Sequence, residues 1–340
     1  MLTIRYEMPA GLLNLEAHEL YKKLEGPTLF HLAGRRKPPL FVSVLLHGNE
    51  PVGWEAIRHL LSQYQNRELP RALSLFVGNI TAARYGLRRL DGQPDHNRIW
   101  TSGNTPEHAM ATQVYEEMAK IGLFASIDIH NNTGLNPHYA CVNKLATPFL
   151  HLAALFSRTV IYFVRPQGVQ SLAFAELGPA VTLECGQPGC PQGVAHAHEY
   201  LTACLHLAEF PFQSVPKQDI ELFHTVAVVR IPPGLRVGFH GDDLDLRLID
   251  NLDQLNFQEL PVNTLLGWQP SNRNILLTVT NEQDQEISGR YFYLNGTELR
   301  TCRPVMPSML TRDIRIIRQD CLCYLMERML LPNASFGVSP

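Results

Sequence analysis

The sequence has no long apolar run and no strong excess of charge of either sign. No uncharged apolar segment approaches the roughly 20 residues that a helix needs to cross a bilayer, and the segment Met1 to Glu7 lacks the pattern of a signal peptide. The formal net charge of the 340 residues is −3, which offers no attraction for nucleic acid or an anionic membrane. We therefore expect neither as a partner. The densest basic segment, 35–37, is predicted to be a solvated loop before a strand.

The sequence also lacks any CxxC pair among its seven cysteines. An odd number of cysteines without paired spacing argues against a disulfide framework and favours a reducing, cytoplasmic location. The simplest interpretation is that the cysteines are small buried apolar residues. With 45% hydrophobic and 18% charged residues, the composition is that of an ordinary globular protein. The length suits two domains, or one large domain with an appendage.

Runs with strand character alternate with helical runs over most of the chain, which is typical of an α/β layer protein. The run 40–46 is almost continuously apolar, as expected of a strand covered on both faces. A helix is predicted to begin at Pro51, and another to follow the N-cap Thr105 and end at Gly122. Further strands are predicted at 73–77, 124–129, 159–164 and 180–183, and a long helix at 192–209.

The segment 210–216, FPFQSVP, interrupts this pattern, so we predict one α/β domain over residues 1–212. Beyond it, short runs with strand character such as 225–229 alternate with turn signals such as Asn295-Gly296. We therefore predict a smaller, mostly β domain over residues 216–340.

The first polar cluster that suits catalysis is His47-Gly48-Asn49-Glu50, between the buried strand and the following helix. Loops beyond the carboxyl ends of strands are where α/β sheets bind ligands. His47 and Glu50 can turn toward one point, and imidazole with carboxylate is a normal ligand set for catalytic zinc. Taken alone the spacing is weak, because a surface histidine and glutamate in a loop look the same.

A second cluster, SIDIHNNTG over 126–134, closes another apolar strand. His130 in it supplies the third ligand that a catalytic zinc needs, which leaves one position for water. Asp128 lies two residues earlier on the same side of the strand and is placed to hold the imidazole of His130. The alternative is a histidine that only caps its own turn.

A third cluster is Asp95-His96-Asn97-Arg98, preceded by Arg88-Arg89. Adjacent amide and guanidinium groups suit recognition of a substrate carboxylate. The alternative is a solvated loop, because the composition of this segment is common in loops.

A fourth cluster, VTLECG over 181–186, places Glu184 at the end of an apolar strand. A carboxylate there is costly to leave unpaired and is a natural general base for a metal-activated water. The alternative is a structural carboxylate satisfied by backbone amides.

The series HGNE, NR, DIHNNTG and LECG resembles the zinc carboxypeptidase superfamily, and most of all its aspartoacylase and succinylglutamate desuccinylase branch. The resemblance implies a mixed central sheet flanked by helices in a zinc-binding catalytic domain. It also implies that the smaller, mostly β domain shapes the active-site mouth. It covers the first domain well and the second only in outline.

The resemblance implies roles for individual residues. His47, Glu50 and His130 would bind one Zn²⁺ per chain, and Glu184 would be the catalytic glutamate. Asn97 and Arg98 would bind a carboxylate or acyl group of the substrate. The implied reaction is hydrolysis of the amide bond of an N-acyl amino acid, or of a similar small substrate that carries a carboxylate.

One departure from the family pattern concerns the arginine that stabilises the oxyanion. The family has a DxNR element, which matches Asp95, Asn97 and Arg98 here. It usually has the oxyanion arginine eight residues before the last residue of that element, where this sequence has Leu90. Arg88 would be its counterpart after a two-residue insertion, and Arg89 is the competitor.

Two other departures affect the substrate and a nearby loop. Aspartoacylases grip aspartate with an arginine ten residues before the catalytic glutamate, where this sequence has Phe174; the nearest upstream arginine is Arg165. The Asn-Pro element of the family is Asn79-Ile80 here. The resemblance therefore implies no preference for N-acetylaspartate and leaves the acyl group and amino acid open.

Two other functions fit the same residues. A metallocarboxypeptidase that removes a C-terminal, for example acidic, residue from a peptide or protein would share every catalytic residue. A non-catalytic metal-binding protein on the same fold would need the three ligands but has no use for Glu184 as a base. An oligomer is compatible with each of these functions.

Overall fold

A computed structural model of the chain describes residues 1–270 and 274–331. The chain forms two compact units, of which the first comprises Met1–Asn131 and His138–Leu222. The second comprises Asn132–Pro137 and Phe223–Met329. The short loop 132–137 therefore leaves the first unit and belongs to the second. None of the helices in the described residues is long and apolar enough to cross a membrane.

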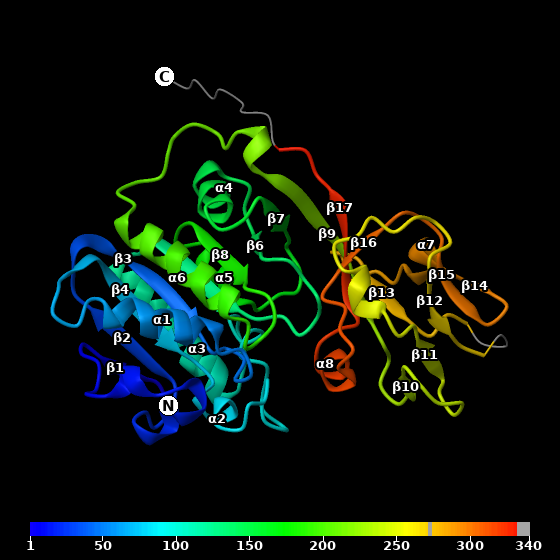
Figure 1. Ribbon diagram of the computed structural model, residues 1–340, viewed down its shortest axis with the longest axis horizontal. Coiled ribbons are helices and arrows are strands. Elements are labelled where there is room, and N and C mark those ends of the chain that lie inside the picture. Colours follow the sequence, from blue (N-terminus) through cyan, green and yellow to red (C-terminus); the bar gives the residue numbers. More distant parts are fainter. Residues whose placement is uncertain (271–273, 332–340) are drawn as a thin grey trace. The chain divides into compact units, whose positions relative to one another are not determined.

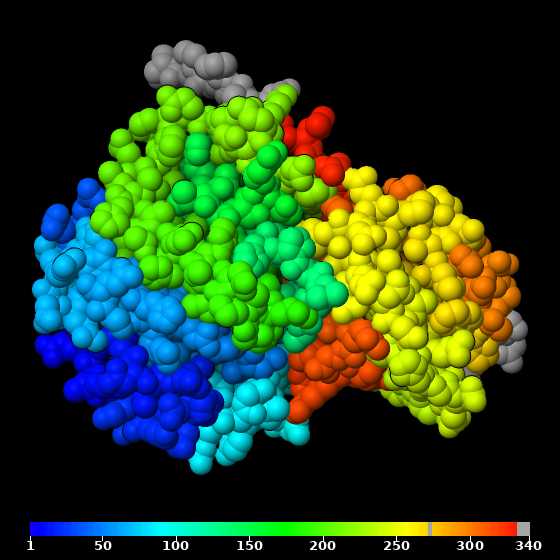
Figure 2. All heavy atoms as spheres, viewed as in Figure 1, coloured from blue at the N-terminus to red at the C-terminus, as the bar shows by residue number. Residues whose placement is uncertain are grey.

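A mixed sheet forms the centre of the first unit (Figure 1). Its middle strands β4, β3, β5 and β8 run parallel to one another, whereas β2 and β6 pair antiparallel with β4 and β8. The strand β1, dark blue in Figure 1, forms one edge. The N-terminal residues have the same colour in the space-filling view of Figure 2. The order is β1 (Thr3–Arg5), β2 (Thr28–Leu32), β4 (Leu69–Val77), β3 (Gly34–Val44), β5 (Ala125–His130), β8 (Ala180–Glu184), β6 (Tyr139–Val142) and β7 (Thr159–Tyr162).

Helices cover both faces of this sheet, which confirms the predicted α/β fold. α1 and α6 pack against each other, and Gly53 of α1 lies so close to Val44 that an added Cβ would be 2.8 Å from its Cγ1. Phe174 of α5 stacks on Phe41 of β3 with ring centroids 4.4 Å apart. Side chains of Phe41 and Val44 point to opposite faces of a strand, so β3 is covered on both sides, as its apolar run predicted. The helices are α1 (Val52–Ser62), α2 (Ile80–Ala83), α3 (Pro106–Ile121), α4 (Thr147–Ala154), α5 (Gln170–Phe174) and α6 (Pro191–His206).

The predicted ends of α3 are confirmed, whereas the predicted loop at 35–37 is wrong. Thr105 caps α3 by accepting a hydrogen bond from the backbone N–H of His108, and Gly122 ends the helix with a φ of 76°. Residues 35–37 belong to β3 because their backbone pairs with β4, where Arg36 is opposite Arg71. Their charged side chains are exposed, which is why the segment looked like a loop in the sequence.

The second unit is smaller and mostly β, as predicted. β9 (Glu221–Arg230) pairs antiparallel with β13 (Thr278–Thr280) and β17 (Cys323–Arg328), and β17 pairs with β16 (Met306–Ser308). A five-stranded sheet has the order β10 (Val237–Gly238), β11 (Leu246–Leu248), β12 (Leu265–Trp268), β15 (Glu298–Thr301) and β14 (Phe292–Asn295). The predicted turn at Asn295-Gly296 joins β14 to β15, and Gly296 has a φ of 62°. Two short helices, α7 (Ser288–Tyr291) and α8 (Ile314–Gln319), complete the unit.

Short 3-10 helices occupy Leu12–Asn14, Ala17–Lys22, Lys217–Asp219 and Leu252–Leu255. The first of them contacts α1, where the Nε1 of Trp54 donates a hydrogen bond to the carbonyl of Leu15 at 2.9 Å, and the second contacts α2.

A buried guanidinium ties the end of α6 to the sheet of the first unit. Arg71 of β4 is only 2% exposed, and its Nη2 donates to the carbonyls of Leu207 and Ala208 just after α6. Its Nη1 donates to the carbonyl of Pro38 at 2.9 Å, and its guanidinium carbon lies 3.7 Å from the centre of the Phe124 ring. The arginine thus satisfies carbonyls that the end of a helix leaves without a partner.

Replacing Arg71 by methionine should lower the free energy of unfolding by about 3 kcal/mol, because three backbone carbonyls lose their charged donor. Urea unfolding of the purified protein measures this loss. The matched control is Arg67→Met at an exposed position, where we expect a change below about 0.5 kcal/mol. Equal effects of the two substitutions would contradict the role given to Arg71.

Candidate metal centre

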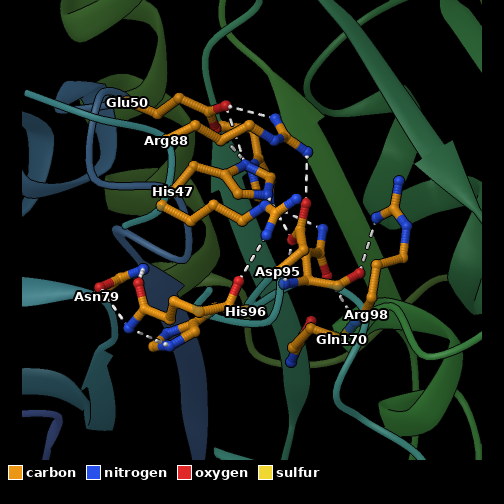
Figure 3. A network of polar contacts seen from close by, with 12 residues as sticks. His47, Glu50, Asn79, Arg88, Asp95, His96, Arg98 and Gln170 are labelled. Carbon is orange, nitrogen blue, oxygen red and sulfur yellow. Dashed lines mark hydrogen bonds and ion pairs between the residues drawn. The ribbon is translucent and has the colours of Figure 1, made fainter. Parts of the chain in front are cut away.

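Three buried side chains converge where the parallel strands of the first unit end. His47 follows β3, Glu50 precedes α1, and His130 is the last residue of β5. The Nδ1 of His47 lies 2.9 Å from Oε1 of Glu50, and the Nδ1 of His130 lies 2.7 Å from Oε2. One ligand atom from each residue lies within 4.8 Å of the others. The structure therefore brings together the three residues that the sequence singled out as metal ligands; Figure 3 shows His47 and Glu50 turned toward each other.

Strand pairing and one glycine account for this convergence. β3 and β5 are parallel neighbours, with Ser43 opposite Asp128, so the residues that follow both strands emerge side by side. A Cβ on Gly48 would lie 2.2 Å from the backbone nitrogen of Ala83 in α2, so only glycine fits. The N–H of Gly48 donates to the carbonyl of Arg88 at 3.1 Å. The HGNE loop is thereby pressed against the loop that carries the two arginines.

An aspartate holds the outer nitrogen of each histidine. The Nε2 of His47 lies 2.9 Å from Oδ1 of Asp95, and the Nε2 of His130 lies 2.7 Å from Oδ2 of Asp128. A carboxylate only accepts hydrogen bonds, so each Nε2 carries a proton and each Nδ1 is the nitrogen turned toward Glu50. Asp128 in turn accepts a hydrogen bond from the hydroxyl of Ser43 at 2.7 Å.

The sequence pointed to Asp128 as the partner of His130, but it missed Asp95 as the partner of His47. Asp95 stands 48 residues from His47, and its neighbours Asn97 and Arg98 pointed only to substrate binding. The signal that would have found it is the demand of a metal-binding histidine for a second hydrogen-bond partner.

The centre is built to hold positive charge. Burial alone would lower the pKa of His130, but Asp128 and Glu50 raise that pKa well above its ordinary value. Burial alone would raise the pKa of Glu50, but the charges of His47 and His130 lower it. For Asp95, burial acts in the raising direction, and the charges of Arg88 and His47 hold the pKa well below its usual range. Protons on the imidazoles or a bound cation can balance these carboxylates.

The donor set fits a zinc ion on chemical grounds. Two imidazole nitrogens and a carboxylate are a usual three-residue set for catalytic zinc, and each histidine has the carboxylate partner typical of such sites. The three ligand residues are each no more than 5% exposed, so few water molecules compete with them.

The two arginines that the sequence left as competitors point to different places. The Nη2 of Arg88 lies 3.0 Å from Oδ2 of Asp95, and its Nη1 lies 3.4 Å from Oε1 of Glu50 (Figure 3). Arg89 instead donates through Nη1 to the backbone carbonyl of Gln93 at 2.6 Å. Arg88 therefore lies at the candidate centre, and Arg89 braces the loop.

Glu184 is the last residue of β8 and lies between two residues of adjacent strands. Its Cα is paired with that of His130 on one side and that of Tyr139 on the other. It is 5% exposed, and its Oε2 receives no hydrogen bond from the described residues. Burial raises the pKa of Glu184 to about 8. These features disfavour the alternative of a structural carboxylate satisfied by backbone amides.

Asn97 lies beside the candidate metal centre, and Arg98 follows it in the chain. The Oδ1 of Asn97 accepts a hydrogen bond from the N–H of Gln170 at 2.9 Å, and its Nδ2 is 3.3 Å from Nε2 of His130. The Nη1 of Arg98 donates to the carbonyl of Asn97 at 2.7 Å. A Cβ on Gly168 would lie 2.4 Å from the carbonyl oxygen of Arg98, so the loop before α5 packs closely on this segment.

Phe174, at the position of the aspartate-binding arginine of aspartoacylases, is a core residue. It is fully buried and contacts the rings of Phe41, Trp100 and Tyr115. Asn79, the first residue of the Asn79-Ile80 pair that stands in place of the family's Asn-Pro, caps α2. Its side chain accepts a hydrogen bond from the N–H of Ala82 at 3.1 Å. Phe174 therefore has a packing role in this chain, and Asn79 has a capping role.

No protein-family model matches the chain, and no curated protein matches it in sequence. Solved structures of similar fold do exist. The succinylglutamate desuccinylase of Vibrio parahaemolyticus is 14% identical, with a TM-score of 0.57 over 86% of this chain and 82% of that one. A succinylglutamate desuccinylase/aspartoacylase of Rhodobacter sphaeroides is 15% identical, with a TM-score of 0.57 over 88% of each chain. Murine aminoacylase 3 is 15% identical, with a TM-score of 0.50 over 87% of this chain and 97% of that one.

These likenesses establish the fold. The chain has the architecture of the desuccinylase and aspartoacylase structures, which confirms the fold that the sequence motifs predicted.

Replacing Asp128 by asparagine should weaken the binding of Zn²⁺ about 10- to 100-fold, because His130 loses the carboxylate that fixes its proton on Nε2. Competition with a fluorescent chelator measures the affinity. The matched control, Asp219→Asn at an exposed position, should bind like the wild type. We expect His130→Ala to lose stoichiometric binding, and retention of one Zn²⁺ per chain would exclude His130 as a ligand.

Proposed function

We propose that this chain is a zinc-dependent hydrolase that cleaves the amide bond of an N-acyl amino acid or a similar small carboxylate. The observation that carries the proposal is the convergence of His47, Glu50 and His130 beside the buried carboxylate of Glu184. The substrate class is supported by the fold, which solved structures of succinylglutamate desuccinylases and an aminoacylase share. In this proposal residues 1–212 carry the catalysis and residues 216–340 shape the active-site mouth.

The three ligands would hold one zinc ion per chain. When bound, such an ion polarises the scissile carbonyl and makes a water molecule acidic enough to act as a nucleophile near neutral pH. His47 and His130 would bind it through Nδ1, because Asp95 and Asp128 hold their Nε2 protons. The chain's own contribution is therefore an oriented pair of imidazoles in a site shielded from water.

Glu184 is the proposed general base. It takes a proton from the water whose oxygen attacks the carbonyl carbon, and it gives that proton to the nitrogen as the C–N bond breaks. A carboxylate that must both accept and donate a proton works best with a pKa near the working pH. The burial that raises the pKa of Glu184 to about 8 acts in that direction.

Arg88, Asn97 and Arg98 complete the proposed site. The guanidinium of Arg88, next to Glu50 and Asp95, stabilises the negative charge that develops on the carbonyl oxygen. Asn97 and Arg98 hold the substrate's carboxylate. They thereby place the scissile amide bond next to the proposed zinc ligands. Because Phe174 is buried in the core, the arginine grip of aspartoacylases has no counterpart at that position. We therefore do not restrict the proposal to N-acetylaspartate.

The two alternatives make different demands on the same residues. A metallocarboxypeptidase would use every one of these side chains on a peptide or protein substrate. A metal-binding protein without activity gives no reason for a buried carboxylate with an unsatisfied oxygen next to the ligands.

The zinc-loaded protein should hydrolyse one or more N-acyl amino acids, with loss of turnover on chelation and recovery on adding Zn²⁺. A screen of N-acyl amino acids and short acidic peptides, read out by the amine released, tests this directly. Cleavage of the peptides alone would favour the carboxypeptidase. Absence of turnover with either class would refute the proposed function.

Glu184→Gln should still bind one zinc per chain but lose turnover by a factor of about 10²–10⁴, the usual contribution of a general base. Metal analysis and initial rates on the same preparation separate the two effects. The control Glu199→Gln changes an exposed glutamate of α6 and should have wild-type activity. Full activity of Glu184→Gln would contradict the assignment of Glu184 as the general base.

A further inference from the structure

The side chain of Gln93 joins three separate parts of the chain next to the candidate centre. Its Oε1 accepts hydrogen bonds from the N–H of Leu90 at 3.1 Å and from Nδ2 of Asn79 at 3.0 Å. Its Nε2 lies 3.3 Å from both Oδ1 of Asn79 and Nε2 of His96. Its backbone carbonyl accepts from Nη1 of Arg89. One residue thus engages both ends of the loop 88–98 and the start of α2.

The orientation of this amide is fixed by its partners. The backbone N–H of Leu90 can only donate, so the oxygen of Gln93 must face it and the nitrogen must face His96. His96 is buried, and burial lowers its pKa to about 4, so its ring is neutral and its Nε2 can accept a hydrogen bond. Figure 3 shows Asn79 and His96 on the side of the network away from Glu50.

Asn79 gives the network a fixed anchor. Asn79 follows β4 and Gly78 in the chain. Its N–H donates to the carbonyl of Leu45 at 2.6 Å, and its Oδ1 caps α2. Asn79 is therefore held by the central sheet and by a helix start at once. The loop 88–98, which is hydrogen-bonded to Asn79 through Gln93, is therefore held by the same elements.

The loop carries two groups that touch the ligands. Arg88 faces Glu50 and Asp95, and Asp95 holds the outer nitrogen of His47. Gln93 lies between these two residues in the chain, where a turn from Leu90 to Gln93 with Gly92 at a φ of 78° folds the loop back on itself. The side-chain amide of Gln93 adds a bond to Leu90 within this turn and bonds the turn to Asn79, which lies outside the loop.

We propose that Gln93 is a positioning residue, which sets the places of Arg88 and Asp95 through its bonds to Asn79, Leu90 and His96. It contacts neither the ligands nor, in the proposed reaction, the substrate. This inference rests on the proposed function insofar as Arg88 acts on the reacting carbonyl.

A positioning role differs from a merely stabilising one in what a substitution changes. Misplacing a catalytic group by about 1 Å can cost about 100-fold in rate. Gln93→Met should therefore bind one zinc per chain and lower kcat about 10- to 100-fold with little change in KM. The control Gln65→Met alters an exposed glutamine and should leave kcat unchanged. A wild-type kcat for Gln93→Met would overturn the proposal.

A double-mutant cycle shows whether Gln93 acts through Arg88. In a background of Arg88→Ala, the same Gln93→Met change should lower kcat by a clearly smaller factor than in the wild type, because one of the two groups that it positions is gone. A loss as large as in the wild-type background would overturn the assignment.

Asn79→Asp is a second variant that serves if Gln93→Met does not fold. Aspartate keeps the oxygen that caps α2 but places an oxygen where Nδ2 donated to Gln93. We expect kcat to fall in the same direction, with one zinc bound per chain, and unchanged kcat would count against the network.

Hydrogen exchange tests the positioning without any turnover. The amides of residues 88–98 should exchange at least about tenfold faster in Gln93→Met than in the wild type, because Leu90 loses its acceptor. The rest of the first unit should exchange as before. If the wild type cleaves no substrate, the proposed function fails, and this measurement alone decides the role of Gln93: unchanged exchange in 88–98 overturns it.

Discussion

The structure of this site depends on burying three carboxylates around two imidazoles. Glu50 lies against the inner nitrogens of His47 and His130, while Asp95 and Asp128 hold the outer ones. Buried charges are tolerated only when opposite charge or hydrogen bonds balance them. The cluster therefore persists only with protons or a cation between the carboxylates, and this demand, more than any single residue, makes the pocket a candidate metal site.

The fold meets that demand through strand register. Parallel β3, β5 and β8 end side by side, and the pairing of His130 with Glu184 places a candidate ligand and the proposed base on adjacent strands. Alternation along β5 then puts Asp128 on the same face as His130. Arg88 adds the nearby positive charge, in contact with both Glu50 and Asp95. The strands set the ligand positions, and one loop supplies the charge that balances them.

Sequence reasoning predicted the parts of this site that strands determine. His47, His130 and Glu184 could be found because each stands at or just beyond the end of an apolar run, and ends of parallel strands meet at one edge of a sheet. Asp128 could be found because its distance from His130 is fixed by the strand period. The same reasoning failed at residues 35–37, where charged side chains on an exposed part of β3 look like those of a loop.

Residues on the loop 88–98 could not be placed in this way, because no period relates sequence distance to position in a loop. Arg88 and Arg89 are adjacent and chemically identical, yet only Arg88 reaches the carboxylates, whereas Arg89 is used to brace a turn. The two arginines are distinguished by a set of hydrogen bonds between side chains and backbone, with Gln93 at its centre. The spacing of residues along the sequence does not predict these bonds. The two-residue insertion that the family resemblance implies for this loop leaves β3 and β5 unchanged. Bonds of this kind must accommodate it. The part of this candidate site that motifs identify least well is therefore the loop that brings Arg88 to Glu50 and Asp95.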